Sequence, residues 1–153
     1  MHLCCDILSA LAGKTLVTAE SCTGGGIGAA LTAVPGSSNV YKGGIISYTN
    51  EVKINQLQVP AELLDRVGAV SAEVAEAMAA GARRVLSADV AVSVTGLAGP
   101  DGDDRGNPVG TVFVGYADQN CVYSRAFLFS GERDSVRIQA IEAALKVVLE
   151  NNK

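Results

Sequence analysis

The stretch KTLVTAESCTGGG, residues 14–26, joins a short apolar segment to a turn that contains three consecutive glycines. Residues 14–19 are rich in β-branched and apolar side chains, which predicts a buried strand. Small and apolar residues follow at helical spacing in residues 27–34, and Pro35 and Gly36 end that pattern. A buried strand that passes through a glycine turn into a helix indicates an α/β fold.

Helices and strands alternate on both sides of this stretch. The predicted helices cover residues 3–12, a short segment capped by Asn50, a segment that starts at Pro60, a segment from Ser71 whose core face includes Val85, and residues 136–148. The predicted strands cover residues 43–49 and 89–96, followed by a hairpin of residues 110–116 and 122–129.

This order predicts one domain, residues 1–153, with the fold class of a three-layer α/β/α sandwich. Its sheet should be mixed, mostly parallel, with one antiparallel strand. Ligands usually bind beyond the carboxyl ends of such strands. We therefore expect residues 20–26, 48–53 and 95–102 to converge on one site.

Composition and charge exclude several classes of protein. With 48% hydrophobic and 18% charged residues, the chain is not disordered. A net charge of -4 argues against a nucleic-acid partner, and no apolar run approaches the roughly 18 residues of a membrane span. Because the N-terminus lacks the basic start of a signal peptide and the four cysteines form no CxxC pair, we expect reduced thiols and a cytoplasmic location.

The side chains available for chemistry are few. The only histidine, His2, lies at the terminus, which excludes a Ser-His triad and a histidine-based metal site. The acids around Asp101 do not fit a calcium loop, because Arg105 and Val112 fall where ligands are needed. We therefore expect neither a metal nor a cofactor.

The glycine turn has a structural and a functional interpretation. Ser21 or Thr23 can simply cap the helix, with the glycines allowing tight packing. Alternatively, the backbone N–H groups around Thr23, Gly24 and Gly25 can bind a phosphate or an oxyanion at the helix start. The spacing Gly24-x-Gly26-x-x-Ala29 also permits a dinucleotide-binding interpretation, which a single short motif supports only weakly.

The segment from Tyr48 to Lys53 becomes important because a histidine base is missing. A lysine at a strand end is usually solvated, and its ordinary pKa of about 10.4 makes it a poor base. If Ser21 is a nucleophile, however, lysine is the usual substitute for histidine. Lys53 must then lie in a dry pocket, where desolvation lowers its pKa. Tyr48 would relay the proton or hydrogen-bond Ser21.

Two further segments bear on the site. Residues 95–102 place the Thr95 hydroxyl at a strand end, and glycines such as Gly96 and Gly99 let the backbone approach a ligand; an ordinary Pro-Asp-Gly turn is the alternative. Cys22 is a rival nucleophile beside Lys53. We expect adjacent residues of the turn to point in different directions, so that only one of Ser21 and Cys22 faces the pocket, and the residues alone do not decide which.

The whole chain resembles the CinA C-terminal domain family, which includes the nicotinamide-nucleotide amidohydrolases called PncC. The resemblance is carried by Thr18-Ala-Glu-Ser-Cys-Thr-Gly-Gly25, Pro35-Gly-Ser-Ser38, Tyr48-Thr-Asn-Glu-Val-Lys53, Gly68-Ala-Val-Ser71, Thr95-Gly-Leu-Ala-Gly-Pro-Asp-Gly102, Pro108-Val-Gly-Thr111 and Gly131-Glu-Arg-Asp134 with Arg137. Larger CinA proteins carry an additional N-terminal domain, and this chain is similar to the stand-alone form.

The resemblance implies deamidation of nicotinamide mononucleotide (NMN) to nicotinate mononucleotide and ammonia, without a cofactor. It places the family's catalytic serine, tyrosine and lysine at Ser21, Tyr48 and Lys53, and it links Thr95 and Arg137 to the site. The alternative is a non-catalytic nucleotide-binding or regulatory module of the competence/damage-inducible type. We also expect a homodimer or higher homo-oligomer, because the helices are rich in small residues.

Overall fold

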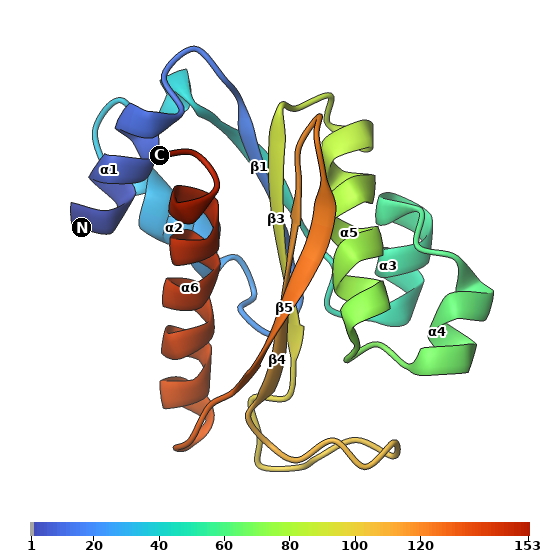
Figure 1. Ribbon diagram of the computed structural model, residues 1–153. Helices are drawn as coiled ribbons and strands as arrows, with labels where there is room; N and C mark the ends of the chain where they lie inside the picture. The colour runs from blue at the N-terminus through green and yellow to red at the C-terminus, as the bar shows by residue number, and fades with distance from the viewer. Residues whose placement is uncertain (1) are drawn as a thin grey trace.

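The computed structural model describes residues 2–153, in which one five-stranded sheet lies between two layers of helices (Figure 1). The strands are β1 (Leu16–Glu20), β2 (Tyr41–Ile46), β3 (Val90–Gly96), β4 (Thr111–Ala117) and β5 (Val122–Leu128). The helices are α1 (His2–Ala10), α2 (Gly26–Thr32), α3 (Asn50–Leu57), α4 (Ala61–Val67), α5 (Ala72–Val85) and α6 (Arg133–Glu150), with a 3-10 turn, η1 (Ser37–Asn39).

The strand order is β2-β1-β3-β4-β5. β1 pairs in parallel with both β2 and β3, whereas β4 is antiparallel to β3 and to β5. β4 is therefore the one strand that runs against the other four, which confirms the predicted mixed sheet. Helices α1, α2 and α6 cover one face of the sheet, and α3, α4 and α5 cover the other (Figure 1).

The core consists of two apolar clusters, one on each face of the sheet. Every residue of β1 is buried, and successive side chains contribute to opposite faces, as the two-residue period of a strand requires. Leu16 belongs to the cluster beneath α1, α2 and α6, while Val17 and Ala19 belong to the cluster beneath α5. β1 is thereby fixed from both sides, and so is the position of Ser21, which follows it.

Three local predictions need correction. Thr49, not Asn50, caps α3, because its side-chain oxygen accepts a hydrogen bond from the backbone N–H of Val52 at 3.4 Å. Pro60 precedes α4 as its N-cap residue and is not inside the helix. Val85 does not face the core: it ends α5 and is 40% exposed. Ser71 does cap α5, as predicted, by accepting a hydrogen bond from Val74 N at 3.3 Å.

Helix α3, which carries Lys53, packs tightly against α5 at a glycine. A Cβ atom at Gly81 would overlap the backbone carbonyl oxygen of Leu57 at the end of α3. The absent side chain therefore sets how closely the two helices approach.

We expect Gly81→Ala to lower the free energy of unfolding by about 1–3 kcal/mol, because the added methyl group must push α5 away from α3. In an unobstructed helix the same change is stabilising by about 1 kcal/mol. Urea unfolding measures the difference, and Ala80→Gly, at the neighbouring position, is the control that reports helix propensity alone. A Gly81→Ala protein more stable than wild type would contradict the tight approach.

Candidate active site

The three segments that were expected to converge do so around one cavity of about 370 Å³. The predicted residues that line it are Ser21, Tyr48, Lys53, Thr95, Gly96 and Gly99. Ser21 follows β1, Tyr48 precedes α3, and Thr95 and Gly96 end β3. The site therefore lies at the carboxyl ends of parallel strands, where α/β sheets usually bind ligands.

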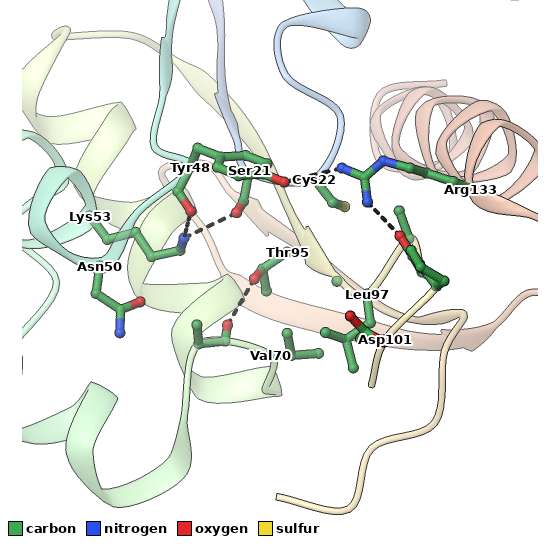
Figure 2. A pocket seen from close by; sticks show the side chains of 15 residues that line it. Ser21, Cys22, Tyr48, Asn50, Lys53, Val70, Thr95, Leu97, Asp101 and Arg133 are labelled. Atoms are coloured by element: carbon green, nitrogen blue, oxygen red, sulfur yellow. Dashed lines mark hydrogen bonds between the residues drawn. The ribbon is translucent and has the colours of Figure 1, made fainter. Parts of the chain in front are cut away.

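Ser21 and Lys53 are in direct contact at the base of this cavity (Figure 2). The Lys53 Nζ atom lies 3.0 Å from Ser21 Oγ, and the two side chains are almost fully buried. Nζ also donates hydrogen bonds to the backbone carbonyl oxygens of Ser47 at 2.7 Å and Tyr48 at 3.3 Å. The lysine thus points inward, as a base for Ser21 requires.

Three oxygen atoms surround Nζ, and they match the three N–H donors of the protonated amine. When the amine is neutral, the two carbonyl oxygens can keep both N–H donors, and the lone pair is then directed at the Ser21 hydroxyl. Burial lowers the pKa of Lys53 from 10.5 to about 8, and the interaction with Cys22 opposes that shift. With this pKa, about one tenth of the amine is neutral at pH 7 and about half at pH 8.

Local sequence explains why Lys53 reaches the serine. Ser47 is fully buried after β2, and its backbone N–H donates to Glu20 O at 2.7 Å, which joins this segment to the end of β1. The chain then enters α3, where Lys53 N–H donates to Thr49 O at 3.1 Å. Both acceptors of the amine therefore lie immediately before the helix that carries it.

Glu20 holds the turn that presents Ser21. Its carboxyl group is 1% exposed and accepts three hydrogen bonds, from Thr23 Oγ1 at 2.7 Å, Ile27 N at 2.9 Å and Gly28 N at 3.0 Å. A carboxylate at a helix N-terminus also interacts favourably with the helix dipole. This role of Glu20 was not predicted from the sequence, although an acid just before a glycine-rich helix start is a signal for it.

The same contacts change the expectation for the glycine turn. The N-terminal N–H groups of α2 and the Thr23 hydroxyl already bind Glu20, and Thr23, Gly24 and Gly25 are not among the residues that line the cavity. Glu20 also occupies the helix start that a dinucleotide pyrophosphate would need. The turn positions Ser21, and its glycines do not form the cavity wall.

Arg137 is also placed outside the cavity wall. Its Nε donates to Cys22 O at 3.1 Å and its Nη2 donates to Thr23 O at 3.2 Å. The arginine therefore holds the serine turn by its carbonyl groups. A different arginine, Arg133, lines the cavity, and sequence reasoning had not singled it out.

Tyr48 and Thr95 lie in different parts of the cavity. The Tyr48 side chain is 59% exposed, and its hydroxyl oxygen accepts a hydrogen bond from Arg133 Nη2 at 3.1 Å, whereas the expected partner was Ser21 (Figure 2). The Thr95 side chain is buried, and its hydroxyl donates to Ala69 O at 2.8 Å. Tyr48 thus lies toward the opening of the cavity, and Thr95 belongs to its fixed wall.

Cys22 lines the cavity together with Ser21, so the expectation that only one of them faces it is wrong. The chain turns immediately after Ser21, and consecutive side chains no longer alternate as they do in a strand. Burial raises the pKa of the Cys22 thiol to about 11, which a hydrogen bond from its own backbone N–H and the charges of Lys53 and Arg137 only partly offset. The thiol is therefore protonated at neutral pH, while the Ser21 hydroxyl contacts the amine.

Known proteins that are similar to this chain identify its family. The profile of the family described as CinA C-terminal domain matches residues 4–151. The chain belongs to this family. Its relatives include the nicotinamide-nucleotide amidohydrolase PncC of Pseudomonas putida, which is 49% identical over 135 residues that cover 88% of this chain and 84% of that protein.

Other members of the CinA C-terminal domain family are longer. A CinA-like protein of Citrifermentans bemidjiense is 54% identical over 125 residues, which cover 82% of this chain but 30% of that protein. The chain therefore spans less than a third of the length of such relatives. A CinA superfamily crystal structure from Klebsiella pneumoniae superposes with a TM-score of 0.95 at 35% identity, covering 98% of this chain and 95% of that one.

None of the helices in residues 2–153 is both long and apolar enough to cross a membrane. No group of three or more histidine, cysteine, aspartate or glutamate side chains in that range is arranged to hold a metal ion.

The buried amine predicts a pH dependence of stability. Because the pKa of Lys53 falls from 10.5 to about 8 on folding, the unfolded chain binds more protons between these values, and stability rises with pH across that window. We expect the free energy of unfolding of wild type to increase relative to Lys53→Met by about 3 kcal/mol between pH 7 and pH 10.5.

Urea unfolding at several pH values measures this difference. Lys42→Met removes an exposed lysine and should show no such relative trend. A wild-type protein that keeps a constant offset from Lys53→Met across the range would contradict the burial of the amine.

Proposed function

We propose that the protein is an amidohydrolase that converts NMN to nicotinate mononucleotide and ammonia. The observation that carries the proposal is the 3.0 Å contact between Ser21 Oγ and the buried Lys53 amine. A hydroxyl and a desolvated amine in this arrangement are the nucleophile and base of an acyl-transfer site. The name of the P. putida relative points to a nicotinamide nucleotide as the substrate.

In the first half of the reaction, Lys53 accepts the Ser21 proton as Ser21 Oγ bonds to the carboxamide carbon. The resulting tetrahedral intermediate collapses when the carbon–nitrogen bond breaks, and the leaving nitrogen takes the proton from Lys53, so that ammonia departs. An ester of Ser21 with the nicotinate group remains. The amine is neutral again at the end of this half.

In the second half, water replaces the amide nitrogen. Lys53 accepts a proton from water as its oxygen attacks the ester carbon, and the bond to Ser21 Oγ then breaks. Lys53 returns the proton to Ser21, and the nicotinate product leaves. Each half-reaction uses one proton acceptor and returns it to its starting state, so the chemistry requires no metal or cofactor.

Backbone N–H groups around the nucleophile would stabilise the oxyanion. Cys22 follows Ser21 and lines the cavity. Across residues 2–153, no oxygen of another residue accepts a hydrogen bond from its backbone N–H. The N–H of the residue after a nucleophile is a common oxyanion donor. The proposed oxyanion donor is therefore the backbone N–H of Cys22, whereas the sequence had favoured the N–H groups of residues 23–25.

A non-catalytic nucleotide-binding module is the alternative, because several relatives are named only as CinA-like proteins.

We also propose a cytoplasmic location, which the four free cysteines fit because thiols stay reduced there. A homodimer or higher oligomer stays a prediction.

Replacement of the nucleophile tests the proposal. We expect Ser21→Ala to lower kcat for ammonia release from NMN by about 10³-fold or more, because the hydroxyl that forms the proposed acyl intermediate is removed. Cys22→Ala should retain most of the activity, since its backbone N–H remains and its thiol is protonated. An enzyme-coupled ammonia assay measures both variants, and far-ultraviolet circular dichroism checks that they fold.

The opposite ranking of these variants would move the nucleophile to Cys22. A wild-type protein that binds NMN but releases no ammonia would favour the non-catalytic module.

The base predicts the pH profile of the reaction. Lys53 must be neutral to accept the Ser21 proton, so kcat/KM should rise about tenfold per pH unit below pH 8 and level off above it. Lys53→Arg should be inactive throughout, because a guanidinium stays protonated. Initial rates from pH 6 to 9.5 measure the profile. A rate that is constant across this range would exclude Lys53 as the base.

A further inference from the structure

The phosphate of the proposed substrate needs a cationic side chain that takes no part in the proton transfers. A mononucleotide phosphate carries up to two negative charges, and the protein has a net charge of -4, so a local positive group must bind it. We infer that Arg133 binds the phosphate and thereby selects a nucleotide over the corresponding nucleoside. This inference rests on the proposed function and assigns a residue to its specificity.

Two other candidates for the phosphate are already occupied. The N-terminal N–H groups of α2 bind the Glu20 carboxyl group, so they cannot also bind an anion. The Arg137 guanidinium binds the carbonyl oxygens of Cys22 and Thr23 and is not part of the cavity wall. Displacing either contact would disturb the turn that presents Ser21.

Arg133 is accessible from the cavity and has N–H donors that are not yet hydrogen-bonded. It begins α6, its side chain is exposed, and it lines the cavity. Its Nη1 donates to Gly99 O at 2.5 Å and its Nη2 donates to Tyr48 Oη at 3.1 Å. A guanidinium has five N–H donors, so three remain available for phosphate oxygens.

The two existing contacts also fix the guanidinium in place. One comes from the loop after β3 and the other from the segment before α3, so the arginine is held between the two sides of the cavity opening (Figure 2). An arginine positioned in this way loses less conformational freedom when it binds a ligand. Its planar fork also matches the geometry of phosphate.

The position of Arg133 relative to Ser21 fits the shape of a mononucleotide. Arg133 enters the cavity from α6, and Lys53 lies on the opposite side of Ser21 and Cys22 (Figure 2). In NMN the carboxamide is on the pyridine ring and the phosphate is at the far end of the ribose. A substrate whose carboxamide reaches Ser21 therefore directs its phosphate toward the opening, where Arg133 lies.

Arg105 is the rival cation near the site. It lies beside a neighbouring cavity that shares Asn50, Ala69, Val70 and Leu97 with the first. Its Nη1 and Nη2 donate to the carbonyl oxygens of Arg66 and Asp65 at the end of α4. Asp65, Asp103 and Asp104 line that neighbouring cavity, whereas Asp101 is the one acidic residue lining the cavity of Arg133, so the neighbouring cavity is the poorer environment for an anion.

The test compares NMN with nicotinamide riboside, which lacks only the phosphate. For wild type, Arg133→Met, Arg133→Lys and the matched control Arg105→Met, kcat/KM is measured by ammonia release and Kd by calorimetry. We expect Arg133→Met to reduce the preference for NMN over the riboside by about 10- to 100-fold, the effect of losing a charge-assisted hydrogen bond. Arg133→Lys should restore part of the preference, and Arg105→Met should leave it unchanged.

A purely structural role of Arg133, through Tyr48 or the loop, would weaken both substrates equally and would overturn the inference. So would a loss of the preference in Arg105→Met, or a wild-type protein that binds the two compounds alike. If wild type releases no ammonia but binds NMN more tightly than the riboside in an Arg133-dependent way, the proposed hydrolysis fails and the phosphate assignment stands.

Discussion

The contact between a dry amine and a buried hydroxyl organises this domain. Lys53 can remain neutral only if water is kept away, and it can reach Ser21 only if α3 and the end of β1 are held in register. Glu20 fixes the serine turn from the side of α2, and Gly81 lets α3 approach α5 closely. Residues that never touch the cavity thus determine whether its two central side chains meet.

This arrangement works against the stability of the fold. Burial disfavours the charged form of the amine, so folding near neutral pH must overcome the desolvation of Lys53. The surrounding core offsets that expense with aliphatic side chains on both faces of the sheet, including Leu57 and Met78 on the side of α3 and α5. Under the proposed function, the fold gives up stability at this site to obtain reactivity.

The sequence predicted the layers of the fold better than the details of the site. Runs of β-branched residues located the strands, and the missing histidine pointed to Lys53, because these inferences depend on residue types alone. Which hydrogen-bond donors face the cavity depends on three-dimensional placement. Glu20 removed the α2 N–H groups from consideration, and Arg133, not Arg137, proved to line the cavity. One helical turn separates the two arginines, too little for a sequence pattern to tell which faces the cavity.

Glu20 binds the N–H groups at the N-terminus of α2, and this limits how proteins with this fold can change their ligand. Many α/β proteins recognise phosphate through backbone groups, which point mutations cannot easily alter. Here that option is internally satisfied, so under the proposed function ligand recognition passes to side chains supplied by loops and by the first turn of α6. The proposed reactive and recognition groups then reside on separate segments, and a new substrate preference can arise by exchanging the latter while the former are inherited intact.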